Sequence, residues 1–316
     1  MNRKITVIGA GSVGSATAFA LTLQHTANEI LLIDIDEERA KGEAMDILQG
    51  TPILLEAVKV YAGDYEAARG SDIVVITSGV GRKPGQTRTD LAQVNANIIK
   101  DIAPKITAVC PDATYIIVAN PVDVLTQVFL KVTGLPEYKV LGSGTLLDTS
   151  RLRSRIAEYL KISPKNVRAY VFGEHGETSF VPWSLAQIST VRLDDYKNLI
   201  KLDNDTVVDL DHDEIETYMR TSGSTIIARK GYTNYAIAIS VCSICEAIFS
   251  GVNAIATVST MLHGEYGIEG VCLSLPTVLG SGRVQGRITP KLTEDEVAKL
   301  RHSADALKGL IETLDF

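Results

Sequence analysis

The sequence predicts an α/β fold in which a doubly wound parallel sheet forms the first half and an α+β domain forms the second. Short apolar runs alternate with amphipathic stretches up to about residue 141, which is typical of strands joined by helices. This alternation stops near residue 148, and a capping-box pattern, Thr293 to Glu296, opens a final helix that should reach about residue 314. For a chain of 316 residues we therefore expect two domains, residues 1–147 and 148–316.

Each expected element follows from its local pattern. The strands of the first half are short, β-rich apolar runs at residues 5–8, 30–33, 73–77, 115–118 and 140–141. The helices between them cover residues 12–23, 37–48, 90–110 and 123–132, so the strands should be parallel with right-handed crossovers. In the second half, helices are expected at 151–159, 213–227 and 234–250, with a strand at 167–172 and an antiparallel pair at 255–262 and 271–276.

Composition argues against several classes of protein. The chain has 31 basic and 38 acidic residues, and its net charge of −7 without a basic tract disfavours nucleic-acid binding. The uncharged stretch at residues 247–264 contains too many polar residues to span a membrane. The chain has one C-x-x-C and two further cysteines, which we expect to be reduced thiols of a cytoplasmic protein and not a disulfide framework or a metal site: Cys242, Cys245, Cys110 and Cys272.

A glycine-rich motif follows the first expected strand. Gly9, Gly11 and Gly14 fit the pattern G-x-G-x-x-G, which also contains Val13, and Asp34 comes 20 residues after Gly14 at the end of the second strand. Glycines in this pattern allow a tight turn and a close approach of backbone amides to a pyrophosphate. Asp34 would accept hydrogen bonds from ribose hydroxyls and repel a 2′-phosphate, so this Rossmann pattern predicts NAD and not NADP. The alternative is a structural glycine turn followed by a surface aspartate.

A second group of residues has the chemistry of a catalytic site. His175 stands in a glycine-flanked loop after an expected strand, whereas the other four histidines are expected to be structural. Asp148 and Arg151 are three residues apart, on one face of a helix. Asn120 follows a sheet strand, at the edge where ligands bind in such folds, and Arg88 ends a polar loop after another strand. Taken singly, these residues could be solvated charges or a surface ion pair.

Together these motifs resemble the L-lactate/L-malate dehydrogenase family over nearly the whole chain. The resemblance includes the glycine motif and the runs 119–123, 142–145, 148–153, 173–176 and 230–233. It implies that His175 exchanges a proton with the substrate hydroxyl, that Asp148 orients the imidazole, and that Arg151 clamps the substrate carboxylate. It also implies that Arg88 polarises the reacting carbonyl when its loop closes, and that Asn120 orients the nicotinamide and the substrate.

The resemblance indicates a 2-hydroxy acid as substrate but gives conflicting signals about which one. Glu174 before the histidine is typical of lactate enzymes, as are Thr233, expected to flank the substrate, and Ile237, expected beside the nicotinamide. Arg82, by contrast, stands where malate enzymes carry arginine and lactate enzymes glutamine, and a second guanidinium would pair with the second carboxylate of oxaloacetate. We expect an L-lactate dehydrogenase that also reduces oxaloacetate appreciably; the alternative is an L-malate dehydrogenase.

Two further expectations concern assembly and regulation. Relatives are dimers or tetramers, so the resemblance implies a homo-oligomer, most simply a homotetramer. Arg153 matches an arginine that binds a sugar bisphosphate in some bacterial relatives, but Arg168 replaces the histidine that accompanies it. Two arginines could still bind a phosphate, although arginines without an effector are the favoured interpretation. A non-catalytic NAD-binding module is a remote alternative, because it would not need His175, Asp148 and Arg151 together.

Overall fold

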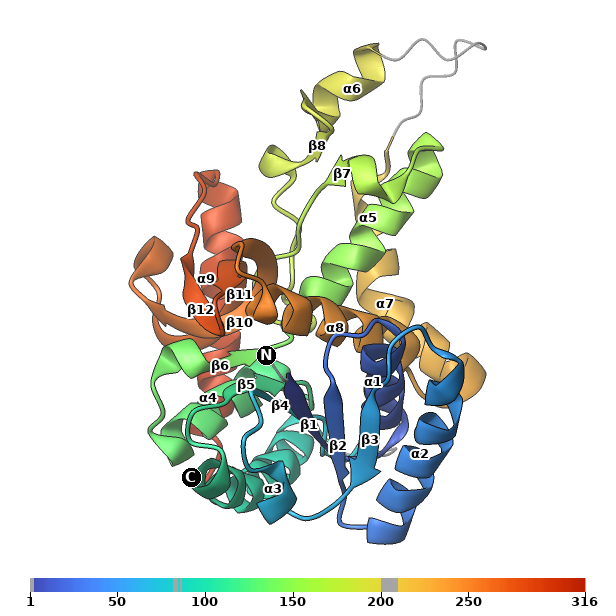
Figure 1. Ribbon diagram of the computed structural model, residues 1–316. Coiled ribbons are helices and arrows are strands. Elements are labelled where there is room, and N and C mark those ends of the chain that lie inside the picture. Colours follow the sequence, from blue (N-terminus) through green and yellow to red (C-terminus); the bar gives the residue numbers. More distant parts are fainter. Residues whose placement is uncertain (1–2, 82–84, 86, 200–209, 316) are drawn as a thin grey trace.

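The computed structural model describes residues 3–81, 85, 87–199 and 210–315, and its centre is one nine-stranded sheet (Figure 1). The strands lie in the order β12-β11-β10-β6-β5-β4-β1-β2-β3. The first six strands pair in parallel: β1 (Lys4–Ile8), β2 (Glu29–Ile33), β3 (Lys59–Ala62), β4 (Ile73–Ile76), β5 (Thr114–Ile117) and β6 (Val140–Gly142). Most of their residues are buried, as expected for strands covered on both faces by helices.

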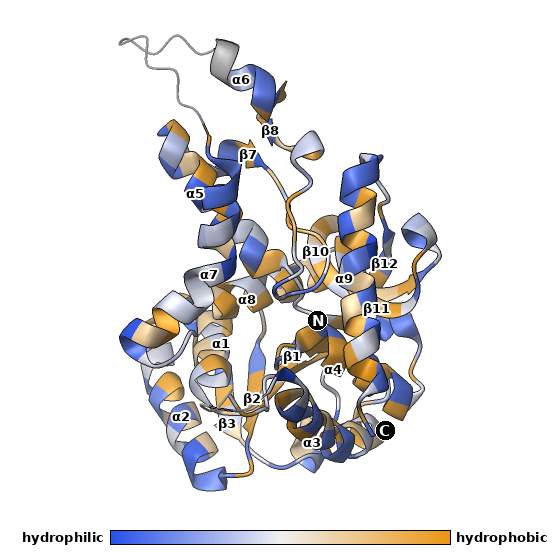
Figure 2. Cartoon of the chain, turned by 180° about the vertical axis from the view of Figure 1, so that it is seen from behind, coloured by the Kyte–Doolittle hydropathy of each residue, from blue (hydrophilic) through white to orange (hydrophobic). Residues whose placement is uncertain are grey.

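Helices pack on both faces of this sheet and create two apolar layers (Figures 1 and 2). One layer is covered by α3 (Arg88–Val109), α4 (Val122–Thr133) and α9 (Glu294–Glu312). The other is covered by α1 (Ser12–Leu23), α2 (Glu37–Gly50) and α8 (Tyr235–Phe249). The free cysteines are all buried, and Cys242 and Cys245 lie in α8. This arrangement confirms the expected doubly wound sheet.

The second half adds strands to the same sheet. The antiparallel strands β10 (Ala254–His263), β11 (Glu269–Gly280) and β12 (Arg283–Arg287) join it where Ser259 pairs with Gly142 of β6. The remaining elements form a smaller unit that projects from one side of the molecule (Figure 1). They are α5 (Leu146–Leu160), β7 (Val167–Arg168), β8 (Gln187–Ile188), β9 (Val191–Arg192), α6 (Leu193–Leu199) and α7 (His212–Lys230).

Several sequence predictions can be compared with these elements. The antiparallel pair is confirmed, and so is the capping box, because Thr293 Oγ1 accepts from the Glu296 amide while Glu296 accepts from the Thr293 amide. The predicted strand 167–172 was wrong beyond Arg168, since the chain leaves the small sheet there and Phe172 makes only an isolated bridge to Phe180. Strand β3 was not predicted; it is a four-residue edge strand with a single short apolar run, Val60 to Ala62. The expected boundary at 147/148 falls inside α5 and stays a prediction.

The described residues contain neither a candidate membrane span nor a candidate metal-binding cluster. None of the helices in the described ranges has the length and apolarity needed to cross a membrane. Within the same part of the chain, histidine, cysteine and acidic side chains form no group of three or more that could hold a metal ion.

Candidate active site

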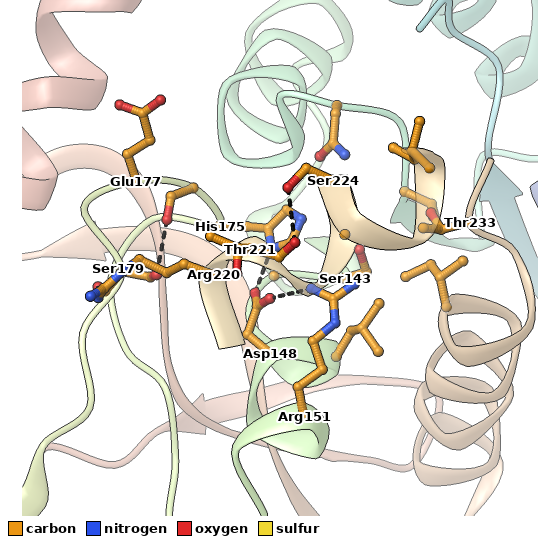
Figure 3. Close-up of a pocket in the computed structure, with 18 of the residues that line it drawn as sticks. Ser143, Asp148, Arg151, His175, Glu177, Ser179, Arg220, Thr221, Ser224 and Thr233 are labelled. Carbon is orange, nitrogen blue, oxygen red and sulfur yellow. Dashed lines mark hydrogen bonds and ion pairs between the residues drawn. The ribbon is translucent and has the colours of Figure 1, made fainter. Parts of the chain in front are cut away.

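A cavity of about 670 Å³ lies beyond the carboxyl ends of β1, β5 and β6 (Figure 3). Residues from both halves of the chain line this cavity. They include five of the predicted site residues: Val13 of α1, Asn120 after β5, Asp148 and Arg151 of α5, and His175. Thr233 and Ile237, which precede and begin α8, line it as well. The carboxyl edge of a parallel sheet is the usual place for a ligand in this fold class.

The glycine motif forms the turn between β1 and α1. Gly9 has a φ of +104°, which favours glycine, and a Cβ on Gly14 would overlap the Gly9 carbonyl. Gly11 is the N-cap of α1, and a Cβ on this residue would meet no atom within 4 Å. The helix start therefore faces open space with free backbone amides, an arrangement that fits a pyrophosphate.

Asp34 lies beside this turn. It directly follows β2, and its Oδ2 accepts a hydrogen bond from the Ala10 amide at 2.5 Å while Oδ1 accepts from the Asp36 amide at 2.9 Å. These bonds hold the carboxylate at the side of the nucleotide turn, where the sequence predicts a ribose contact. The residues present therefore fit a dinucleotide without a 2′-phosphate.

His175, Asp148 and Arg151 form one hydrogen-bonded group at the cavity wall (Figure 3). Asp148 Oδ2 contacts His175 Nδ1 at 2.5 Å, and Asp148 Oδ1 accepts from Arg151 Nη1 at 2.9 Å. The carboxylate is 6% exposed, against 26% for the imidazole and 14% for the guanidinium. With Nδ1 bound to Asp148, His175 Nε2 is the ring nitrogen left for an external partner.

The electrostatics of this group favour proton exchange at the imidazole. The charge of Asp148 raises the pKa of His175, although burial opposes this effect. Burial raises the pKa of Asp148, but the neighbouring His175 and Arg151 outweigh it and hold that pKa below its ordinary value. The pair thus places a carboxylate of lowered pKa behind an imidazole of raised pKa, and each group favours the charged form of the other.

Arg88 is held by the residue before the histidine. It begins α3, and its guanidinium makes an ion pair with Glu174, whose side chain is 1% exposed. Thr178 Oγ1 donates to the other Glu174 oxygen, and Ser303 Oγ accepts from the Glu174 amide at 2.7 Å. Arg88 is not among the residues that line the cavity, so the structure brings it to the catalytic loop but not to the cavity wall. Arg82 lies outside the described residues.

Asn95, which was not among the predicted site residues, binds the backbone of Asn120. Asn95 is buried in α3, and its Nδ2 donates to the Asn120 carbonyl at 2.7 Å and to the Val80 carbonyl at 3.1 Å. Its Oδ1 accepts from the Val80 amide at 2.9 Å. One side chain therefore ties the loop after β4 to the loop after β5, and a buried asparagine in an apolar helical stripe was the available signal.

A second wall of the cavity was also missed. It consists of residues of α7, at helical spacing on one face: Arg220, Thr221, Gly223, Ser224 and Ile227. The Arg220 guanidinium donates to the Ser179 carbonyl at 3.1 Å and to Glu216 at 2.8 Å. The sequence predicted this helix, but its mixture of small polar residues carries no catalytic motif. The spacing of positions 220, 223, 224 and 227 was the signal that could have identified the wall.

The two arginines of the suggested effector site lie away from the cavity lining. Arg153 donates from Nε to the Ala169 carbonyl at 3.0 Å and lies over the Tyr170 ring, 4.7 Å from its centroid. Burial lowers the pKa of Arg153, and the nearby charge of Arg168 adds to this effect. Arg168 is exposed in β7. Their proximity is compatible with an anion, and the effector role stays a prediction.

A dinucleotide turn and an imidazole–carboxylate–guanidinium group around one cavity define the class as a dinucleotide-dependent oxidoreductase. Comparison with known proteins agrees. Residues 3–142 match the family described as lactate/malate dehydrogenase, NAD binding domain, and residues 145–315 match its alpha/beta C-terminal domain. The chain belongs to the lactate/malate dehydrogenase family and is an NAD-dependent oxidoreductase acting on a CH–OH group.

Individual relatives extend over the whole chain. The L-lactate dehydrogenase of Thermoanaerobacter pseudethanolicus is 43% identical over 314 residues, which are 99% of both chains. That of Acetivibrio thermocellus is 42% identical over 313 residues, 99% of this chain and 98% of the relative. Among solved structures, a lactate dehydrogenase from a Medee basin deep-sea metagenome library has a TM-score of 0.94 at 37% identity, covering 100% and 99% of the chains. The minor L-lactate dehydrogenase from Enterococcus mundtii has a TM-score of 0.93 at 34% identity with the same coverage.

Proposed function

We propose that the protein is an L-lactate dehydrogenase, which reduces pyruvate with NADH and oxidises L-lactate with NAD. The observation that carries the proposal is the position of His175 Nε2, free of protein partners among the described residues, beside Arg151 and on the same cavity as Val13 and Asn120. Relatives named L-lactate dehydrogenase that span the whole chain support the choice of substrate.

The proposed reaction needs a hydride and a proton at neighbouring atoms. When bound, NADH supplies the hydride to the carbonyl carbon of pyruvate. Arg151 binds the pyruvate carboxylate through two parallel hydrogen bonds, which fixes the carbonyl group beside the imidazole. His175 releases the proton on Nε2 to the carbonyl oxygen, and Asp148 stabilises the imidazolium before this transfer. Oxidation of L-lactate reverses both transfers, with neutral His175 accepting the hydroxyl proton.

Arg88 is proposed to polarise the reacting carbonyl. Its guanidinium is paired with Glu174, next to His175 in sequence. Donation to the substrate carbonyl therefore requires the guanidinium to share or leave the Glu174 carboxylate. A buried carboxylate next to the catalytic histidine provides a defined resting position for this arginine.

Oxaloacetate is proposed as a second substrate on the basis of Arg82. A second guanidinium in a closed site would pair with the second carboxylate of this 2-oxo acid, whereas a methyl group would leave it unpaired. L-malate dehydrogenase is the alternative if oxaloacetate is the better substrate.

The test is NADH oxidation with pyruvate and with oxaloacetate by the wild type, Arg82→Gln and His175→Ala. We expect the wild type to have a higher kcat/KM for pyruvate than for oxaloacetate. Arg82→Gln should lower kcat/KM for oxaloacetate and leave kcat/KM for pyruvate unchanged. His175→Ala should lose turnover with both acids and keep NADH binding. Preference of the wild type for oxaloacetate would favour the malate alternative, and retained turnover in His175→Ala would refute the role of the histidine.

We also propose a homo-oligomer, most simply a homotetramer in the cytoplasm. Exposed large hydrophobic side chains occur on four helices: Phe19 and Leu23 of α1, Met45 and Leu48 of α2, Tyr218, Ile226 and Ile227 of α7, and Tyr235 and Ile239 of α8. Helices α1, α2, α7 and α8 lie on the same side of the molecule (Figure 1), and a second copy of the chain would cover such apolar surface. Light scattering after size-exclusion chromatography should give four times the chain mass of 34.1 kDa. A monomer would refute the proposal.

A further inference from the structure

Asp123 is a buried carboxylate that the reaction proposed above does not use. It is the second residue of α4 and follows the turn that contains Asn120. Its exposure is 1%, and Asp123 and Asp148 are the two buried aspartates of the described residues. An ionised carboxylate in such a position is costly unless it is hydrogen-bonded or paired with an opposite charge.

The main chain of the catalytic histidine donates to this carboxylate. The His175 amide hydrogen bonds to Asp123 Oδ2 at 2.8 Å. The buried hydroxyl of Ser259 in β10 lies beside the same carboxylate. His175 is therefore flanked by two carboxylates. Asp148 holds its ring, and Asp123 holds its backbone from the opposite half of the chain.

The charges around Asp123 couple it to the imidazole. Burial raises the pKa of Asp123 above its ordinary value and the charge of Asp148 adds to this, although Ser259 and the amide and ring of His175 oppose the rise. In return, the charge of Asp123 adds to that of Asp148 in raising the pKa of His175. The groups that face His175 are Asp123 of α4 and Asp148 and Arg151 of α5. Burial also raises the pKa of Cys272 in β11, which lies near Asp123 and remains a neutral thiol.

We propose that Asp123 is a positioning residue for proton transfer: its carboxylate fixes the backbone at His175 and stabilises the imidazolium together with Asp148. Because Asp123 and Asn120 belong to the same turn and helix start, this bond also sets the imidazole relative to the residue expected at the nicotinamide. The inference rests on the proposed function, since it assigns Asp123 a part in that reaction. A 1 Å displacement of a catalytic group can cost about 100-fold in rate.

The experiment compares Asp123→Asn with Asp123→Ala in pyruvate reduction across pH. The asparagine keeps an oxygen that can accept from the His175 amide and turns its NH₂ toward Ser259, but it removes the charge. Pyruvate reduction requires protonated His175, so the rate falls as pH rises through the pKa of His175. Without the Asp123 charge that pKa is lower, and the fall of kcat/KM on the alkaline side should move to lower pH in both variants.

The plateau kcat at low pH distinguishes the two roles of Asp123, which are to fix the backbone at His175 and to supply a negative charge. Asp123→Asn should keep kcat within a few-fold of the wild type, whereas Asp123→Ala should lose about 100-fold. Asp101→Asn, an exposed aspartate of α3, is the matched control and should change neither quantity. NADH binding, measured by fluorescence, checks that each variant is folded.

Two results would overturn the proposal. One is a pH profile of kcat/KM for Asp123→Asn whose fall on the alkaline side coincides with that of the wild type. The other is a folded Asp123→Ala whose plateau kcat equals that of Asp123→Asn. If Asp123→Ala does not fold, the pH profile of kcat/KM for the nearly isosteric Asp123→Asn is sufficient to test the proposal. A wild type that oxidises no NADH with pyruvate or oxaloacetate refutes the proposed function itself, before any variant is compared.

Discussion

The two walls of the cavity are built differently. On the wall formed by α5 and the His175 loop, Asp148 binds both His175 and Arg151, and the exposures of these three side chains run from 6% for Asp148 to 26% for His175. On the α7 wall, Thr221 and Ser224 are exposed, Gly223 has no side chain, and the helix buries only Ile215 and Met219 among its described residues. Preorganised charges serve the chemical step, whereas a small, polar and solvated surface can adapt to a substrate side chain. We therefore expect the first wall to control turnover and the second to control substrate choice.

Arg151→Lys should have the largest effect, because it acts on the paired wall. Lysine cannot form two parallel hydrogen bonds to a carboxylate, and its ammonium would not reproduce the bond to Asp148. We expect kcat/KM for pyruvate to fall about 1,000-fold. Arg220→Lys on the α7 wall is the matched control and should lose less than about tenfold, since the Arg220 guanidinium contacts Ser179 and Glu216. Steady-state kinetics of both variants test this difference, and equal losses would remove the distinction between the walls.

Asp148→Asn should lower kcat by about 100-fold and change the pH dependence. The charge of Asp148 is the largest cause that raises the pKa of His175, so the variant should have a lower histidine pKa. Pyruvate reduction, which needs the protonated ring, would then be lost at lower pH than in the wild type. L-Lactate oxidation, which needs the neutral ring, would be gained at lower pH. pH profiles in both directions check this sign, and the displacement should exceed that of Asp123→Asn; unchanged profiles would contradict the assignment.

The difference between the walls also explains what the sequence could predict. The nucleotide turn was predictable because Gly9 and Gly14 act through local backbone geometry, which the sequence spacing reveals. Asp148 and Arg151 were predictable for a similar reason, since three residues along a helix place them on one face. Their relation to His175 is non-local and followed only from the family resemblance.

Other parts of the site depend on contacts between distant segments that have no local signature. The bond from the His175 amide to Asp123 joins residues 52 positions apart, and the bond from Glu174 to Ser303 joins residues 129 apart. The Arg220 side chain reaches the cavity only because α7 packs against α5. Strand β3 was missed for the related reason that its pairing with β2 stabilises an edge segment of weak intrinsic pattern.

Glu174→Gln should have an intermediate effect, on stability and on turnover. The buried carboxylate pairs with Arg88 and accepts from Thr178, so the neutral amide would lose a charge-assisted contact. We expect the free energy of unfolding to fall by about 1–2 kcal/mol and kcat/KM to fall about tenfold. Glu177→Gln, an exposed position of the same loop, should leave the melting temperature unchanged. A Glu174→Gln protein with wild-type melting temperature and kcat/KM would show that the pair with Arg88 has no effect.

Gly223→Ala should have the smallest effect with pyruvate and is the most direct test of the α7 wall. An added Cβ would lie 3.6 Å from Arg151 Nη2, an ordinary van der Waals contact, so the carboxylate clamp need not move. Alanine favours the helix over glycine by up to about 1 kcal/mol, and the melting temperature should rise slightly. The kcat with pyruvate should stay within about threefold, whereas 2-oxo acids with longer side chains should lose about tenfold, since one methyl group in a pocket is worth about 1–3 kcal/mol. If pyruvate and the longer acids lost activity equally, α7 would support Arg151 and not select the substrate side chain.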